Sequence, residues 1–379
     1  MRPTLWLGLS TLGLTACSGA KQPLVTAVAP VAVDKPVPEW AGWTRIEPEA
    51  GTMCSDGSAY SFFAREADPT KLLVYFQGGG ACWNGETCSQ ERIGSYRPVI
   101  GDTDPADSDG IFALDNPSNP FADYSMVFVS YCTGDVHLGD SEVTYHVSAA
   151  HADQELDEGQ DPAAHSVTIQ HKGHHNAMTV LAWTYAQFEA ADTIFVAGSS
   201  AGSIPSPYFG SHLATQYPNA QLAVLGDAAG GYRGSADGPM FDRWNTLEAI
   251  GVHEAYADVE RADLSYAQLY IEAAQHRQDL IFAQYDTAED SIQRRFLAMS
   301  GAESTSLLPM LDANHSDIGE QVSNVKSYVA AGDQHTVLRR PDFYTIKVAD
   351  VALRDWVASL ARGEALTDVH CGWACTTED

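Results

Sequence analysis

The chain has 379 residues, and its 50 acidic against 21 basic side chains give a formal net charge of −29 at pH 7 and a pI near 4.5. Such an acidic chain repels nucleic acid and anionic membrane surfaces, so we expect neither as a partner. The charge also disfavours a strongly anionic polymer as ligand, unless a local basic patch is present.

The first residues have the features of a secretory signal. Arg2 precedes an apolar run from Leu5 to Leu14 that is too short to span a membrane. The run ends in Leu-Thr-Ala followed by Cys17, which resembles the lipobox of bacterial lipoproteins and implies cleavage before Cys17 and attachment of lipid to it. An ordinary cleaved signal, with no role for Cys17, is the alternative. The lipobox predicts a protein tethered in the cell envelope, at the outer membrane or cell surface, by its lipid alone.

These features divide the chain into three parts. Residues 1–16 are the predicted signal peptide. Residues 17–39 are predicted to be a flexible tether, because they are rich in Ala, Val, Pro and Lys with no usable period. Residues 40–379 are within the reach of one large α/β domain with loop insertions, and no internal repeat is evident. We expect this single domain to be a monomer.

Six cysteines remain once Cys17 is assigned to the lipid, and an exported protein meets an oxidising compartment. Their spacing favours two short local loops, which leaves one long-range pair: Cys82 with Cys88, Cys371 with Cys375, and Cys54 with Cys132. Other pairings stay open, because spacing alone does not decide connectivity. Zinc is the competing interpretation, but no two of these cysteines stand in a Cys-x-x-Cys pair.

The first predicted strands frame a glycine loop. Residues 71–77 form a short apolar, β-branched and aromatic run that ends at Gly78-Gly79-Gly80, and residues 125–131 form a second such run. Residues 84–124 between them are dense in Gly, Pro, Asp and Asn, so we predict a loop there.

A helix and a third strand lead to the most informative motif. Apolar residues at helical spacing predict a helix over 175–190, and a buried strand over 193–197 follows. This strand enters Gly198-Ser-Ser-Ala-Gly202, the Gly-x-Ser-x-Gly turn that lifts a serine nucleophile, here Ser200, above a sheet. The glycines are needed because a Cβ at either position would clash in such a sharp turn. Strand, helix and strand in this order indicate a parallel sheet.

The rest of the chain continues this alternation. The predicted elements are a helix over 207–217, strands over 221–226 and 279–285, helices over 291–299 and from 314 onward, a last strand over 326–331 and a closing helix over 348–361. The order predicts an α/β-hydrolase-like fold, which is a mostly parallel sheet flanked by helices, with long loop insertions.

An α/β-hydrolase presents its catalytic triad in the chain order Ser, acid, His, each at the carboxyl end of a strand. Ser200, Asp286 and His335 satisfy this order and this placement. We predict that Ser200 attacks an acyl carbonyl, that His335 takes its proton and returns it to the leaving alcohol, and that Asp286 holds the imidazole in the right tautomer.

Other residues compete for the acid and the base. Asp227 ends the strand directly after the nucleophile, which is one strand early for the usual arrangement. Asp333 is too close in sequence to the predicted histidine to reach its Nδ1 easily. His315 lies in a polar segment, and His370 lies beside a cysteine pair. Strand order therefore favours Asp286 as the acid and His335 as the base.

The glycine loop has a chemical use beside such a serine. Attack on an ester creates a tetrahedral oxyanion, and bare glycine backbone at the end of a strand supplies N–H donors without side-chain obstruction. We predict the amides of Gly79, Gly80 and Ala201 as these donors. A mere flexible turn is the alternative.

The cluster His171-Lys-Gly-His174-His175 resembles a metal site at first sight. It lies at the start of a predicted helix and has no acidic residue at ligand spacing beside it, so we predict no metal and no other cofactor.

Five segments together resemble the pectin acetylesterase and Notum family. They are Phe76-Gln-Gly-Gly-Gly-Ala-Cys-Trp-Asn84, Val129-Ser-Tyr-Cys-Thr-Gly-Asp-Val-His-Leu-Gly139, Gly198-Ser-Ser-Ala-Gly-Ser203, Gln284-Tyr-Asp286 and Asp333-Gln-His-Thr336. The resemblance runs in chain order from about residue 51 to residue 356. It implies a carboxylic ester hydrolase of α/β-hydrolase fold, with the triad and the oxyanion donors named above.

One position departs from the family's animal members, which carry Trp where Gly80 stands and use a pocket for a long lipid acyl chain. We locate no such pocket in the sequence, so removal of a protein-bound fatty acyl group is not carried over. The resulting prediction is a metal-independent serine esterase that releases acetyl or another short acyl group from an esterified polysaccharide. The alternatives are a hydrolase of longer acyl or polyester substrates and a non-catalytic carbohydrate-binding protein on the same scaffold.

Overall fold

A computed structural model of the protein describes residues 39–40, 42–48, 51–101, 105, 108–148, 165–232 and 240–376. The predicted signal peptide over 1–16, Cys17 and nearly all of the predicted tether lie outside these residues. Within the described ranges, no helix is long and apolar enough to cross a membrane.

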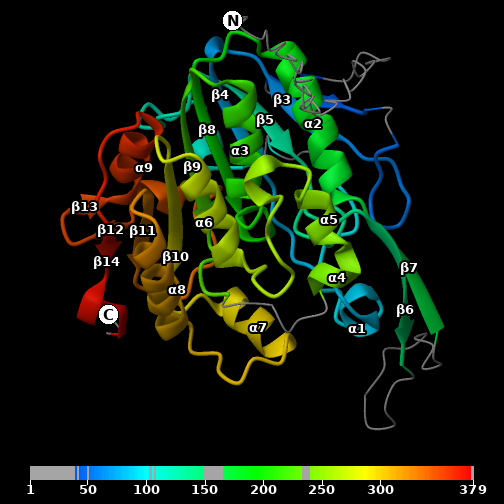
Figure 1. The fold of residues 1–379 in the computed structure, drawn as a ribbon. Helices are drawn as coiled ribbons and strands as arrows, with labels where there is room; N and C mark the ends of the chain where they lie inside the picture. Colours follow the sequence, from blue (N-terminus) through cyan, green and yellow to red (C-terminus); the bar gives the residue numbers. More distant parts are fainter. Residues whose placement is uncertain are drawn as a thin grey trace, which may run out of the picture.

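A ten-stranded sheet runs through the molecule (Figure 1). Its strands are, in spatial order, β1 (Glu39–Trp40), β2 (Trp43–Ile46), β3 (Phe62–Arg65), β5 (Tyr124–Val129), β4 (Asp68–Phe76), β8 (Thr193–Ser199), β9 (Gln221–Asp227), β10 (Ile281–Thr287), β11 (Val325–Ala330) and β14 (Val369–His370). The strands from β5 to β14 are parallel, whereas β1, β2 and β3 join antiparallel at one edge. The carboxyl ends of the parallel strands therefore meet at one edge of the sheet.

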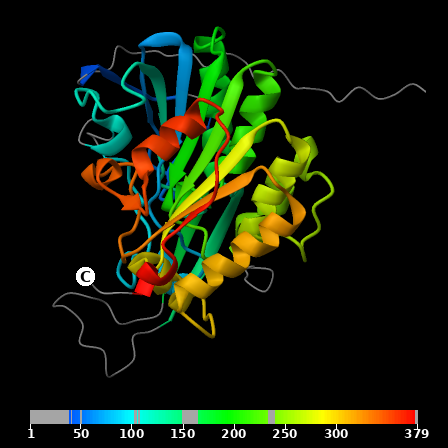
Figure 2. The same ribbon diagram turned by 90° about the vertical axis from the view of Figure 1, so that its left-hand side faces the viewer.

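Helices cover both faces of this sheet (Figure 2). Helices α2 (Gly173–Gln187), α3 (Ser206–Gln216) and α6 (Tyr266–His276) lie on one face, with α8 (Leu307–Gln321) beside α6. Helix α9 (Leu353–Ala361) lies on the opposite face. The mostly parallel sheet flanked by helices confirms the predicted α/β-hydrolase-like fold.

Two hydrophobic cores follow from the alternation of side chains along the strands. In β4, Leu72 and Val74 join the core beneath α2 and α3, while Leu73 and Tyr75 join the core beneath α9. All four of these side chains have no exposed surface. A strand that is buried on both faces has a continuous apolar sequence, and this run is the pattern that predicted the strand β4.

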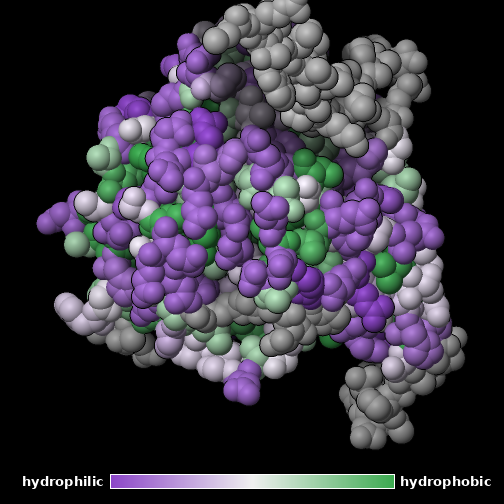
Figure 3. All heavy atoms as spheres, viewed as in Figure 1, coloured by the Kyte–Doolittle hydropathy of each residue, from purple (hydrophilic) through white to green (hydrophobic). Residues whose placement is uncertain are grey.

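The remaining elements are short. They are α1 (Gly85–Cys88), the hairpin β6 (Ser141–Val147) with β7 (His165–His171), α4 (Met240–Trp244), α5 (Thr246–Ile250), α7 (Ser291–Met299), the two-residue pair β12 (Lys347–Val348) and β13 (Val351–Ala352), and five 3-10 turns. The surface over α3, α6 and α8 is mostly hydrophilic, as expected for such a charged chain (Figure 3).

Three sequence expectations need correction. The segment 84–124 is not wholly loop, because it contains α1 and a 3-10 turn at Gly110–Phe112. The strand near 326–331 is not the last, because β14 pairs with it further along the chain. The helix expected from 314 onward begins at Leu307, because Pro309 falls in its first turn, where a missing backbone N–H is tolerated.

Candidate active site

Ser200 occupies the turn between β8 and α3. It begins a one-turn 3-10 helix, and its φ of +55° is left-handed, which a serine adopts only when the surrounding structure imposes it. A Cβ built on Gly198 would lie 2.0 Å from the carbonyl oxygen of Gly202, and a Cβ on Gly202 would lie 2.0 Å from that of Phe76. The steric reason predicted for both glycines is therefore confirmed.

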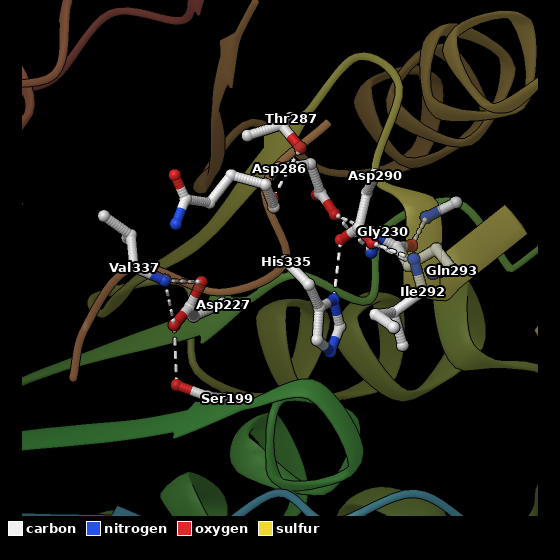
Figure 4. Close-up of polar contacts among 12 residues, drawn as sticks. Ser199, Asp227, Gly230, Asp286, Thr287, Asp290, Ile292, Gln293, His335 and Val337 are labelled. Atoms are coloured by element: carbon white, nitrogen blue, oxygen red, sulfur yellow. Dashed lines mark hydrogen bonds and ion pairs between the residues drawn. The ribbon is translucent and has the colours of Figure 1, made fainter. Parts of the chain in front are cut away.

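His335 follows β11 and is held by an aspartate. Its Nδ1 donates a hydrogen bond of 2.7 Å to Oδ2 of Asp290, whose side chain is fully buried (Figure 4). The prediction that Asp286 orients this histidine is therefore wrong. Figure 4 shows Asp290, four residues beyond Asp286, facing the imidazole.

The correction has a simple physical reason. Asp286 still lies inside the β10 ladder, opposite Val329 of β11. Beyond β10 the two chains stay together, because Ala288 and Glu289 donate backbone hydrogen bonds to the carbonyls of Ala330 and Gly332. The segment after the strand therefore runs alongside the histidine loop for several residues before α7 begins, and the first of them able to reach the imidazole is the residue at the start of that helix.

Asp290 is the N-cap of α7. Its Oδ1 accepts from the backbone N–H groups of Ile292 and Gln293, both at 2.9 Å, which leaves Oδ2 to accept from His335. A sequence signal for this position existed. Asp290 with Gln293 three residues later, before the amphipathic run 291–299, is a helix-start pattern of the capping-box type.

Asp286 has a different environment. Its Oδ1 accepts from Gly230 N at 3.0 Å and from Gln293 Nε2 at 2.8 Å, and that same amide nitrogen also donates to Asp290. Burial raises the pKa of Asp286 to about 8, with smaller contributions in the same direction from the carboxylates of Asp290 and Asp227. At neutral pH Asp286 is therefore mostly protonated, and it touches the histidine only through Gln293 and Asp290.

Asp227, the alternative acid, is also assigned by its contacts. It accepts from Ser199 Oγ at 2.6 Å and from the backbone N–H groups of Val337 and Leu338 at 3.0 to 3.1 Å. Burial raises its pKa to about 6, although these hydrogen bonds oppose the rise. Asp227 therefore clamps the residue before the nucleophile to the loop that follows His335.

The predicted oxyanion residues surround the serine. Gly79, Gly80, Ser200 and His335 line one open cavity of about 400 Å³ at the carboxyl edge of the sheet. Gly80 and Ala201 also line a second cavity on the other side of Ser200. The structure thus brings Ser200, His335, Gly79 and Gly80 to one cavity and Ala201 to the adjoining one, and Asp290 takes the place beside His335 that was predicted for Asp286.

Sequence comparison connects this geometry with a known family. The family model described as Pectinacetylesterase matches residues 41–249, which is more than half of the chain. The chain belongs to the pectinacetylesterase family. The matched region contains the glycine loop and Ser200 and ends before Asp290 and His335.

Curated relatives match a shorter region. The palmitoleoyl-protein carboxylesterase NOTUM of Schmidtea mediterranea is 29% identical over 92 residues, and that of Homo sapiens is 30% identical over 93 residues. Each alignment covers 23% of this chain and 18% of the relative. The chain therefore spans less than a fifth of the length of these relatives.

The second cavity of this pectinacetylesterase-family chain is mainly apolar and partly open to solvent. It has a volume of about 80 Å³, and its wall beside Gly80, Ser200 and Ala201 is formed mainly by Trp83, Val136, Ile204, Tyr232, Phe296 and Leu297. Sequence reasoning did not find it, because these six residues come from five separate segments of the chain.

All three predicted disulfides are present. Cys54–Cys132, Cys82–Cys88 and Cys371–Cys375 have Cα–Cα distances of 5.1, 4.9 and 5.1 Å. The Cys82–Cys88 bridge closes the short helix directly after the glycine loop, and Cys132 lies at the end of the neighbouring strand β5. Two of the bridges therefore tie down the backbone on the oxyanion side of the site.

The other histidines singled out in the sequence have partners away from Ser200. His171 donates from Nδ1 to the carbonyl of Thr133 at 3.0 Å, and its Nε2 accepts from Tyr145 at 2.9 Å. His174 contacts the hydroxyl of Tyr208 at 2.9 Å. His315 and His370, the rejected bases, contact Gln284 and Asp312. Their rings serve the packing of the fold.

Proposed function

We propose that the protein is a serine carboxylic ester hydrolase. The observation that carries the proposal is the placement of Ser200, in a left-handed turn at the end of β8, on the same cavity as His335, whose Nδ1 is held by Asp290. A serine hydroxyl is a weak nucleophile unless a positioned base takes its proton. The hydrogen bond to Asp290 keeps the proton on Nδ1 and leaves Nε2 as the base.

The proposed reaction has two halves. Ser200 Oγ attacks the acyl carbonyl as His335 Nε2 accepts its proton, and the oxyanion forms beside the amides of Gly79, Gly80 and Ala201. The intermediate then collapses, and His335 returns the proton to the departing alcohol. Water, deprotonated by the same histidine, releases the acid and restores the serine.

The apolar cavity beside Ser200 supports a short acyl group. Its space of about 80 Å³ holds a few groups the size of a water molecule, and its lining is mainly apolar. A short acyl chain such as acetyl to butanoyl fits that space. The name of the NOTUM relatives gives them a palmitoleoyl-protein substrate, whereas the small volume here favours a shorter group for this chain.

The open cavity receives the alcohol part of the ester. Arg97 and Arg339 line it. The Arg339 guanidinium lies 5.1 Å from the Phe128 ring and donates to Ser108 Oγ, which fixes its position. Guanidinium groups beside the cavity support an acetylated acidic polysaccharide over a neutral one as the substrate.

The proposed localisation is the cell envelope, where lipid on Cys17 would anchor the domain. This rests on the apolar run and the Leu-Thr-Ala-Cys sequence alone.

The test uses the mature protein and a series of 4-nitrophenyl esters from acetate to palmitate. We expect the highest kcat/KM between acetate and butyrate, and a loss of at least about 1000-fold in Ser200→Ala, since the triad acts as a unit. Release of acetate from acetylated polygalacturonate and from acetylated xylan then compares an acidic with a neutral polymer.

Each part of the proposal has its own contrary result. Equal activity of wild type and Ser200→Ala excludes the serine mechanism, and a maximum beyond octanoate excludes a short acyl group. Faster release from xylan removes the argument for an acidic sugar. Failure of a fluorophosphonate probe to label Ser200 in the folded protein favours a non-catalytic carbohydrate-binding protein.

A further inference from the structure

The motif Tyr131-Cys-Thr-Gly-Asp-Val-His137 follows β5 and touches the glycine loop from behind. Tyr131 Oη donates to the carbonyl of Gly80 at 2.9 Å, and His137 Nε2 donates to the carbonyl of Gln77 at 2.8 Å. A third loop carbonyl, that of Gly79, accepts from the backbone N–H of Arg97 at 3.1 Å. The loop lies beyond the end of β4, so its conformation depends on these contacts.

Holding a carbonyl also directs the adjacent N–H group. In a trans peptide the C=O and the following N–H point in opposite directions, so a hydrogen bond that orients one orients the other. The Gly79 carbonyl, held by the N–H of Arg97, shares its peptide with the N–H of Gly80. The carbonyls of Gln77 and Gly80 belong to the two flanking peptides, so His137 and Tyr131 fix both ends of the segment that carries the N–H groups of Gly79 and Gly80. Glycine backbone has more conformational freedom than any other, and a preset oxyanion site must remove that freedom.

The turn that carries His137 is strained. Val136 and His137 have φ values of +51° and +59°, and a β-branched residue at positive φ is a genuine outlier. Such strain persists only where the surrounding structure imposes it, and it is concentrated at functional sites. Here Val136 N donates to the Tyr131 hydroxyl at 2.8 Å, so one hydroxyl joins the strained turn to Gly80.

Both anchors keep one hydrogen-bonding state over the neutral range. Burial lowers the pKa of His137 to about 4, so the ring is neutral and its Nε2 proton serves the carbonyl of Gln77. Burial raises the pKa of Tyr131 well above its usual value, with the Asp135 carboxylate adding to the rise, so its hydroxyl stays a donor. Only 2% of Tyr131 and 1% of His137 is exposed, so water does not replace them.

We infer that Tyr131 and His137 are positioning residues of the esterase site, which hold the glycine loop with its N–H groups directed at the developing oxyanion. This inference rests on the proposed serine esterase activity. It assigns a function to a motif that contains none of the triad residues. Neither residue contacts the reacting atoms, so both act through the loop.

The test compares Tyr131→Phe with Tyr256→Phe. Tyr256 is the matched control, because it is also fully buried and donates to a main-chain carbonyl, that of Leu269 at 2.9 Å in α6, away from the glycine loop. We measure kcat and KM for 4-nitrophenyl acetate, the second-order rate of fluorophosphonate labelling of Ser200, and Tm. Loss of one oxyanion donor costs roughly 100- to 1000-fold in kcat, so a misdirected donor should cost about 10-fold or more.

We expect Tyr131→Phe to lower kcat and the labelling rate together by about that factor, with KM changed less than about threefold, because a ground-state ester gains little from the oxyanion donors. Tyr256→Phe should change both rates and KM by less than about twofold at a similar loss in Tm. Equal kinetic effects in the two variants would overturn the inference. A wild-type protein that neither hydrolyses the ester nor reacts with the probe would instead refute the proposed function.

Two variants of His137 test the same inference if Tyr131→Phe does not fold. His137→Gln places an amide N–H near the position of the imidazole Nε2, whereas His137→Leu removes the donor to Gln77. We expect kcat of the Gln variant to exceed that of the Leu variant by about fivefold or more, on the scale of a misdirected oxyanion donor, at similar KM and Tm. Equal kcat values in this pair would also overturn the inference.

Discussion

The two halves of the site are built differently. Around Ser200 and the glycine loop the geometry comes from backbone close approach, since a Cβ on Gly78 would lie 2.4 Å from the carbonyl oxygen of Ser199 and 2.9 Å from Cβ of Ser200. Around His335 it comes from side chains, since Asp290 and Gln293 form a hydrogen-bonded chain from the imidazole into the protein. The Ser200 half has no space for added atoms, whereas the His335 half depends on the charge and protonation of its side chains.

The difference predicts how each half fails. An extra methyl group on the nucleophile side has no space to enter without moving backbone, so it should disturb catalysis and stability together. A carboxylate changed to an amide on the acid side keeps the shape and changes only charge and proton position, so catalysis should be lost without unfolding. Three variants test this comparison, from the largest expected effect to the smallest.

The largest effect is expected for Asp290→Asn. The amide still caps α7, since Asn is as good an N-cap as Asp, but it no longer holds the proton on Nδ1 of His335. We expect kcat to fall by about 1000-fold with little change in Tm. Asp286→Asn is the matched control and should stay within about threefold of wild type, because its contacts with the histidine are indirect. The reverse ranking in steady-state kinetics would restore Asp286 as the triad acid.

A smaller effect is expected for Gly78→Ala. The added Cβ meets the carbonyl of Ser199 at 2.4 Å, so the loop or the elbow must move. We expect kcat to fall about 10- to 100-fold, as for a misplaced oxyanion donor, and the free energy of unfolding to fall by about 1–3 kcal/mol. The control is Gly319→Ala on an exposed turn of α8, where a Cβ meets nothing within 4 Å and should raise stability by up to about 1 kcal/mol. Wild-type kcat in Gly78→Ala would contradict the close approach.

The smallest effect on catalysis is expected for Asp286→Asn, which instead tests the pH dependence of stability. Burial raises the pKa of Asp286 from 3.8 to about 8, so the folded protein holds this proton more tightly than the unfolded chain. Its contribution to stability is therefore fully present below about pH 4 and is lost as the pH rises to about 8.

Urea unfolding of wild type and Asp286→Asn at pH 5 and pH 8 measures this contribution. The free energy of unfolding should fall less between these pH values in the variant, which has no proton to lose. Asp135 and Asp227, whose pKa values burial raises to about 7 and about 6, contribute to both proteins and cancel in the comparison. Equal falls in the two proteins would show that Asp286 titrates normally.

The nucleophile half was predictable because its causes are local in the chain. A buried strand, a tight turn and a helix follow one another within residues 193–216, and the sterics of the turn require Gly198 and Gly202. The same holds for the glycine loop after β4 and for the short disulfides Cys82–Cys88 and Cys371–Cys375. Each of these patterns lies within one short segment of the chain, so it can be recognised from the sequence without knowledge of the fold.

The acid half was predictable only in part. His335 follows the strand β11 as expected, but strand order pointed to Asp286, the last acidic residue of a strand-like run. The chain after β10 stays paired with residues 330–333, and no local pattern shows how long such pairing lasts. A helix-capping pattern at Asp290 is present in the sequence, but the strand-end rule makes no use of it.

The sequence by itself determined the α/β-hydrolase-like order of elements and placed Ser200, His335 and the glycine loop at strand ends, because each depends on neighbouring residues or on a fixed chain order. Only the tertiary structure decided which cysteines pair, the partner of His335, the apolar cavity beside Ser200, and the contacts of Tyr131 and His137 with the glycine loop. These depend on side chains from segments tens of residues apart. Their meeting depends on strand register and on where each loop leaves the sheet, and local sequence patterns do not specify either one.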